Sequence, residues 1–156
     1  MQVEPIAQGQ LSNRRSKQDL RLWLRMLACT TLIERDVRSL LRRSFDVTLP
    51  RFDFLAVLYR ADGNLTMSEL SHRLMVSNGN VTGLAERLES EGLISRTPWP
   101  RDRRTVHVAI SSKGRKEFER IAVMHEQWVA EMFSGLDDEE VDDLWRLLGR
   151  LKDTLE

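Results

Sequence analysis

The sequence predicts a mainly α-helical fold that carries one small β-hairpin. First, apolar residues recur at intervals of three and four through most of the chain, which is the period of an amphipathic helix. Second, two short apolar segments, 93–97 and 106–110, flank a run rich in proline and arginine, as expected of two strands joined by a turn. Third, the 156 residues are 41% hydrophobic and 31% charged, which is typical of one globular domain.

The N-terminal third predicts a tail followed by two helices. Residues 1–16 are polar and lack periodicity, so we expect a flexible tail. Apolar residues from Leu20 to Phe45 recur along one face, which predicts a long helix. Pro50 suits the first turn of a second helix, which we expect to be short, largely buried and closed by the Gly and Asn of 61–64.

Cap residues then predict two short helices joined by a tight turn. Thr66 and Glu69 fit a capping box, in which the hydroxyl accepts from the third amide and the carboxylate accepts from the cap amide. Ser77 fits the N-cap of the next helix, and Gly92 fits its end. The inward positions of that second helix are Val81, Leu84 and Leu88.

A hairpin and two further helices complete the predicted elements. The two strands flank a tip at 98–104 that contains two prolines and three arginines. The helical period returns from Ser111, and Asp137 with Glu140 fits the cap of a last helix. This order of elements predicts a winged helix-turn-helix in which the hairpin is the wing.

The domain organisation follows from that order. We place the winged helix-turn-helix at 49–110, with helical regions at 17–48 and 111–156, in one compact domain. A single cysteine, Cys29, excludes an internal disulfide framework. No apolar run approaches the roughly 18 residues that a membrane helix needs, and the first residues lack an export pattern. We therefore expect a cytoplasmic protein without a membrane partner.

The charge is balanced in total but uneven along the chain. The 24 basic and 24 acidic side chains give a net charge of zero. Between positions 96 and 104, however, four arginines accompany one acidic residue, Asp102. Nucleic-acid binding depends on such local patches rather than on the total.

The exposed face of the helix after Ser77 has the side chains that bind base edges. Asparagine can form two hydrogen bonds to adenine, and glycine lets a helix approach the major groove closely. Glycine and asparagine inside a helix cost roughly 0.5–1 kcal/mol each, so this composition indicates a use other than stability, although a poorly composed exposed helix is the alternative. We predict double-stranded DNA as the partner. The predicted contacts on this helix are Ser77, Asn78, Asn80, Thr82 and Arg87, beside Gly79, Gly83 and Glu86.

The hairpin tip supplies a second predicted contact with DNA. Arg101, Arg103 and Arg104 are suited to a narrow minor groove, where arginine is favoured electrostatically. Asp102 lies between them and can hold one guanidinium in place, which would stabilise the wing. Considered alone, such a tip is more often a solvated loop.

Several segments between Leu49 and Gly114 also carry a resemblance. They are LPRFDFLAVL, the helix pair TMSELSHRLMVSNGNVTGLAERLESEGLISR and DRRTVHVAISSKGR. Asp102 and Arg104 form an Asp-x-Arg motif in the wing, and Ser111 with Gly114 forms a Ser-x-x-Gly entry into the next helix. The chain thereby resembles the MarR family of bacterial transcriptional regulators. Trp99 departs from the acidic or small residues common at that place in the family.

The resemblance implies a homodimer that binds a pseudo-palindromic operator and releases it when a small ligand enters near the dimer interface. The subunit contact would use the N-terminal helix and the last two helices. The residues agree, because the first and last helices carry more apolar surface than one small domain can cover. The predicted dimer contacts are Trp23, Leu27, Leu144, Trp145, Leu148 and Leu151, with Leu24 and Leu155 beside them.

A row of arginines predicts a site for an anionic effector. Guanidinium groups bind carboxylate and phosphate through two hydrogen bonds. The segment TLPRFDFLAVLYR also resembles the branch of the family that responds to hydroxycinnamoyl or benzoyl thioesters, so we expect an aromatic carboxylate or an aryl-CoA thioester and control of aromatic compound catabolism. A solvated helical face is the alternative. The residues are Arg35, Arg38, Arg42 and Arg51, with Arg43 beside them.

Other functions find less support in the sequence. His72, His107 and His125 lie on separate predicted elements, and there is no P-loop, nucleophile elbow or dinucleotide turn, so we expect no enzyme, no metal and no cofactor. We expect Cys29 to be a small buried residue, with a peroxide sensor as the alternative. A winged-helix module that binds protein without sequence-specific DNA binding is the alternative function; unlike DNA binding, it would be indifferent to salt.

Overall fold

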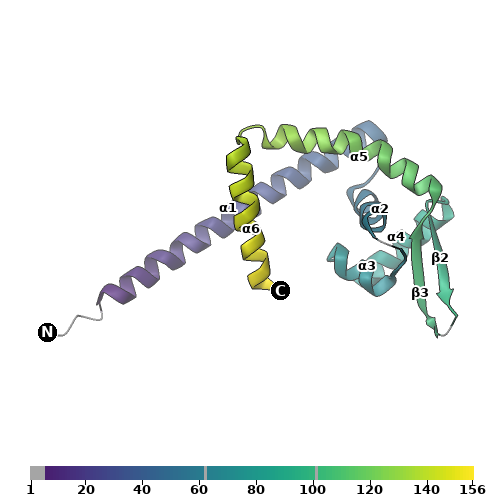
Figure 1. Cartoon of the computed structure of the whole chain (residues 1–156), viewed down its shortest axis with the longest axis horizontal. Helices are drawn as coiled ribbons and strands as arrows, with labels where there is room; N and C mark the ends of the chain where they lie inside the picture. The colour runs from purple at the N-terminus through teal and green to yellow at the C-terminus, as the bar shows by residue number, and fades with distance from the viewer. Residues whose placement is uncertain (1–5, 62, 101) are drawn as a thin grey trace. The chain divides into compact units, whose positions relative to one another are not determined.

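The structure of the chain, a computed structural model, is mainly helical with a small antiparallel sheet (Figure 1). It describes residues 6–61, 63–100 and 102–156, apart from the side chains of 6–12, 78, 103 and 104. The predicted fold class is confirmed. The elements within the described ranges are α1 (Ile6–Phe45), α2 (Leu49–Arg60), β1 (Leu65–Thr66), α3 (Met67–Leu74), α4 (Asn78–Ser90), β2 (Ile94–Trp99), β3 (Asp102–Ile110), α5 (Ser112–Phe133) and α6 (Asp138–Leu155).

The chain divides into two compact units, 1–36 and 37–156. The first unit contains most of helix α1, which begins at Ile6 and so includes much of the segment predicted as a flexible tail. Its Gln, Ala, Leu, Arg and Lys residues are good helix formers. The sequence pattern missed this stretch because residues that are polar on every face produce no periodicity.

Two expectations for the first unit concern its exposed side chains. Cys29 is exposed, so the prediction that it is a buried small residue is wrong for the single chain. Trp23 and Leu27, which were predicted at the dimer contact, are 55% and 46% exposed. A lone helix buries little of its own surface, so the apolar stripe remains open.

The core of the second unit is built around α2, which the sequence correctly predicts to be short and buried. Phe54, Leu55 and Leu58 are at most 1% exposed. Since α2 is buried on more than one face, its apolar residues do not form a single stripe. Helices α3, α4 and α5 and the sheet complete this core through Leu70, Ala85, Leu88, Val108 and Ile121.

The helix-turn-helix has the predicted capping box at the start of α3. Thr66 Oγ1 accepts from the Glu69 amide at 3.2 Å, and Glu69 Oε2 accepts from the Thr66 amide at 2.7 Å. The bond from the Thr66 amide, and a second that the Thr66 hydroxyl donates to the same Oε2 at 2.8 Å, favour the charged carboxylate and lower the pKa of Glu69. Met75 ends α3 with a left-handed backbone, φ 53°, and Ser77 begins α4 with an extended backbone. No capping bond to the Ser77 side chain occurs among the described residues.

The sheet has the strand order β1-β3-β2, and its two longer strands extend beyond the helices as a hairpin (Figure 1). Strand β1 was not predicted; its two residues pair with β3 at Val108 and His107. The predicted loop 98–104 is also largely wrong, because β2 runs to Trp99 and β3 starts at Asp102. Pro98 is accommodated because β2 is an edge strand, where the absence of an amide proton is tolerated. The strand register also shifts between Pro98 and Trp99.

The junction of α4, β2 and α5 is closely packed. Gly92 follows the end of α4 with a left-handed backbone, φ 74°. The Gly92 amide donates to the backbone carbonyl of Glu89, and the Leu93 amide donates to that of Leu88, at 2.9 Å each. This is the predicted glycine ending. Gly114 in the first turn of α5 lies against the Leu93 backbone, where any added Cβ would collide with the carbonyl oxygen.

Helix α6 has the predicted capping box but buries no residue. The Glu140 amide donates to Asp137 Oδ1 at 2.9 Å, and the Asp137 amide donates to Glu140 Oε2 at 3.0 Å. None of the helices within the described ranges is both long and apolar enough to span a membrane.

Candidate nucleic-acid interface

Helix α4 turns one face into the core and presents the opposite face to solvent. Val81, Ala85 and Leu88 are at most 1% exposed and follow helical spacing. On the outer face, a Cβ added at Gly79 or Gly83 would have nothing within 4 Å. The helix backbone is therefore open to a close approach along this side.

The predicted base-contacting side chains lie on this open face and its flanks. Asn80, Thr82 and Arg87 are exposed, and so is Ser77 at the N-cap. Asn80 and Arg87 border a hollow of about 540 Å³ that also involves Arg38 of α1 and the first residues of α2. Two of the residues predicted to contact DNA therefore lie on the rim of the same hollow. The side chain of Asn78 lies outside the described residues.

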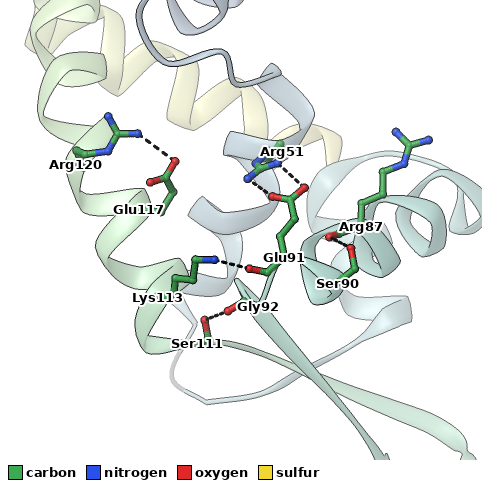
Figure 2. Close-up of polar contacts among 9 residues, drawn as sticks. All are labelled: Arg51, Arg87, Ser90, Glu91, Gly92, Ser111, Lys113, Glu117 and Arg120. Atoms are coloured by element: carbon green, nitrogen blue, oxygen red, sulfur yellow. Dashed lines mark hydrogen bonds and ion pairs between the residues drawn. The ribbon is translucent and has the colours of Figure 1, made fainter.

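Arg87 carries a free positive charge on this face. Figure 2 shows its guanidinium extending away from the neighbouring ion pair. Ser90 Oγ donates to the backbone oxygen of Arg87 at 2.7 Å, but the guanidinium has no partner among the described residues. It is available for an anionic group such as a phosphate.

A partly buried ion pair joins α4 to the wing. Arg96 Nε on β2 donates to Glu89 Oε2 at 2.7 Å, and the Arg96 amide donates to Glu89 Oε1 at 3.2 Å. The two side chains are 26% and 37% exposed. Charge-assisted bonds of this geometry have defined directions, so they fix the strand against the helix.

The last turn of α4 is held from the other side by α2 and α5 (Figure 2). Both terminal nitrogens of Arg51 pair with the Glu91 carboxylate, with Nη1 to Oε1 at 2.8 Å. Lys113 Nζ donates to the Glu91 carbonyl at 2.8 Å, and Ser111 Oγ donates to the Gly92 carbonyl at 2.6 Å. These contacts were not predicted, because partners such as Arg51 and Glu91 are 40 positions apart and no local sequence pattern connects them.

The wing tip is only partly described. Arg101 lies outside the described residues, as do the side chains of Arg103 and Arg104, whose backbones belong to β3. Thr105 Oγ1 donates to Asp102 Oδ2 at 3.0 Å, a contact within the wing. The predicted bond between Asp102 and a neighbouring guanidinium stays a prediction.

The arginines predicted to bind an effector have acidic neighbours. Arg35 Nε pairs with Asp36 at 2.9 Å, and Arg42 pairs with Asp46 at 3.2 Å. Exposed pairs of this kind contribute little and are readily exchanged. Arg38 borders the hollow beside α4, whereas Arg51 is engaged with Glu91. Arg35 belongs to the first unit and the other three arginines to the second, so a shared effector site stays a prediction.

The residues predicted at the dimer contact on α6 form an open apolar stripe. Trp145 is 81% exposed, and Leu144, Leu148 and Leu151 are 38–39% exposed. The polar side of the same helix carries ion pairs such as Arg146 with Asp143 at 2.9 Å. An amphipathic helix with an uncovered stripe is typical of a contact surface.

Comparison with known proteins gives one consistent family. The model of the MarR family matches residues 47–106. An HTH-type transcriptional regulator of Bacillus subtilis, YkoM, is 31% identical over 121 residues, which cover 78% of this chain and 77% of the relative. The regulator PecS of Dickeya dadantii is 30% identical over 110 residues, which cover 69% of this chain and 66% of PecS.

Solved structures agree in fold. A mutant of MarR from E. coli, crystallised with operator DNA, has a TM-score of 0.73 and 26% identity and covers 86% of this chain and 95% of its own. AbsC of Streptomyces coelicolor, a MarR family regulator, has a TM-score of 0.77 with 22% identity, over 88% and 94% of the two chains. The second likeness concerns the fold alone.

Proposed function

Because this chain belongs to the MarR family of transcriptional regulators, we propose that it is a repressor that binds a pseudo-palindromic operator as a homodimer and leaves it when a small anionic effector binds. The observation that carries the proposal is the open face of α4, with two glycines beside exposed amide, hydroxyl and guanidinium groups. Catalysis has no part in this role. A regulator of this kind works in the cytoplasm, where its DNA is.

Helix α4 reads the major groove. Gly79 and Gly83 let the helix backbone approach the base edges, which a larger side chain would hold away. Asn80 is placed to donate to and accept from adenine, and the Thr82 hydroxyl can contact either a base or a phosphate. Arg87, with its free guanidinium, contacts a phosphate or the acceptor edge of guanine.

The wing supplies the second contact. Arg101, Arg103 and Arg104 reach the adjacent minor groove, whose negative potential attracts guanidinium groups. The Glu89–Arg96 pair fixes the wing against α4, so both contacts are made by one preformed unit. Preorganisation of this kind lowers the ordering cost of binding.

Two copies of this unit are joined through the helices outside it. The uncovered stripe of α6 and the exposed apolar residues Trp23 and Leu27 of α1 supply the contact surface. A two-fold axis then sets the two α4 helices on half-sites about one helical turn, roughly 34–36 Å, apart. The dimer therefore requires a pseudo-palindromic site.

The effector is proposed to be an aromatic carboxylate or an aryl-CoA thioester. Arg38 borders the hollow beside α4, and the pairs of Arg35 and Arg42 are exchangeable. Arg51 connects this region to the reading helix, because an anion that displaces Glu91 from Arg51 frees the last turn of α4. Titration calorimetry with p-coumaroyl-CoA tests this class of effector. We expect heat of binding. If no heat is measured with protein that still binds its operator, the aryl-CoA hypothesis is discarded.

A gel-shift series tests the proposed function. The probe is a duplex from the region upstream of the protein's own gene, with an unrelated duplex of equal length as the matched control. We expect a specific shift whose affinity falls steeply between 50 and 200 mM salt, because phosphate contacts release counterions. Absence of a specific shift, or binding that ignores salt, would contradict the proposal and favour a protein-binding module.

A further inference from the structure

The wing carries one large apolar side chain that the fold leaves exposed. Trp99, the last residue of β2, is 43% exposed. No other large hydrophobic residue of the described strands is exposed to a similar extent. The indole lies outside the core, at the end of β2, and is accessible to a partner outside the chain.

The indole lies on the face of the hairpin that points away from the core. Its ring stacks on His107, with centroids 4.6 Å apart and an angle of 35° between the planes. His107 precedes Val108, which is fully buried, and adjacent side chains of a strand point to opposite faces. His107 and Trp99 therefore share the outer face.

The position of the indole is fixed before any partner arrives. Pro98 and Pro100 restrict the backbone on either side of Trp99. His107, on which the ring rests, belongs to the central strand, where it pairs with Thr66 on one side and Thr97 on the other. A rigid aromatic side chain provides contact area at low cost in conformational entropy.

The sequence next to Trp99 indicates the chemistry of the partner. Arg101, Arg103 and Arg104 follow Trp99 within five positions, with Asp102 as the one acidic residue among them. A partner that offers apolar surface between regularly spaced negative charges fits this pattern, and the minor groove does so, with deoxyribose walls between phosphates. The Arg96–Glu89 pair holds the same strand against α4, the helix assigned to the adjacent major groove.

We propose that Trp99 is a DNA-contacting residue whose indole packs against deoxyribose groups of the minor groove beside the wing arginines. The inference rests on the proposed function and adds an apolar contact to it. Because the contact neutralises no phosphate, it contributes affinity that salt does not screen.

The test compares wild type with Trp99→Ala, Trp99→Phe and the matched control Thr97→Ala, an exposed residue two positions back on β2. Affinity for the upstream duplex is measured by anisotropy between 50 and 200 mM salt. We expect Trp99→Ala to bind about tenfold more weakly at every salt concentration with an unchanged salt slope. Trp99→Phe is expected to retain most of the affinity, and Thr97→Ala to match wild type.

A second readout guards against a variant that simply misfolds. The difference between the emission spectra of wild type and Trp99→Phe reports Trp99 alone, and we expect it to change when DNA is added. Any of three results would overturn the inference. Trp99→Ala could bind DNA as tightly as wild type, or its salt slope could fall by about one, as for loss of a phosphate contact. The third result is an emission difference that does not change when DNA is added. Failure of wild type to bind any duplex specifically would instead overturn the proposed function.

Discussion

Arg96 of the wing and Glu89 of α4 form a single ion pair that uses both carboxylate oxygens. One oxygen accepts from the guanidinium at 2.7 Å and the other from the Arg96 backbone amide at 3.2 Å. The Glu89 side chain therefore ties the wing to α4 through two bonds. In the proposed complex with DNA, α4 and the wing enter different grooves, so their relative orientation matters for binding.

Glu89→Gln is expected to weaken operator binding and to lower the free energy of unfolding by about 1 kcal/mol. The amide keeps the shape of the side chain but loses the charge, and one of its two polar atoms is a donor facing another donor. Urea unfolding and anisotropy on the upstream duplex measure the two effects. Glu86→Gln, an exposed residue of the same helix, is the matched control for stability. Equal stability and affinity of Glu89→Gln and wild type would show that the pair does not hold the wing.

If the proposed dimer forms through α6, Trp145→Asp is expected to convert it to monomer at low micromolar concentration. Trp145 is 81% exposed in the single chain, and a carboxylate in its place would be buried without a partner at a subunit contact. Sedimentation equilibrium measures the change, and Asp142→Ala on the same helix serves as the control. A wild type that sediments as a monomer, or a variant that stays dimeric, would exclude α6 from the contact.

The lowered pKa of His125 predicts that the folded protein loses stability as the pH becomes acidic. Burial, and then the positive charge of Arg60, lower the pKa of His125 below its ordinary value of 6.5. The unfolded chain therefore binds a proton more readily than the folded chain as pH falls below about 6.5, so the full stability is present above that pH and declines below it. Its ring also packs against Phe52, at 4.7 Å between centroids.

Urea unfolding at pH 7.5 and 5.5 measures this dependence. His125→Gln should lose less stability between the two pH values than wild type does, whereas His72→Gln, an exposed control, should lose as much as wild type. An equal loss in wild type and His125→Gln would assign the pH dependence to other groups.

Local signals in the sequence predicted the helices and their caps, because the partners in each cap are three residues apart. Thr66 with Glu69 and Asp137 with Glu140 are such cases. Features that depend on distant partners were missed. Strand β1 is only two residues long and is defined by its pairing with β3, some 40 positions later, and Arg51 acquires its partner only through the fold.

In the candidate site, too, local features could be predicted from the sequence and contacts between distant residues could not. Helical periodicity was enough to predict which face of α4 is open, because it follows from Val81 and Leu88 facing inward. It did not predict that Glu89 and Glu91, one on each side of the last turn, hold that helix to the wing and to α2. Nor did it predict that Pro98 would lie in an edge strand, where the lack of an amide proton is tolerated.

The most direct test of the account is the affinity of Asn80→Ala for the operator duplex relative to an unrelated duplex. If short side chains on α4 read base edges, the variant should lose about 1–3 kcal/mol on the operator and little on the unrelated duplex. Equal losses on both duplexes, or no loss on either, would contradict sequence reading by this face of α4.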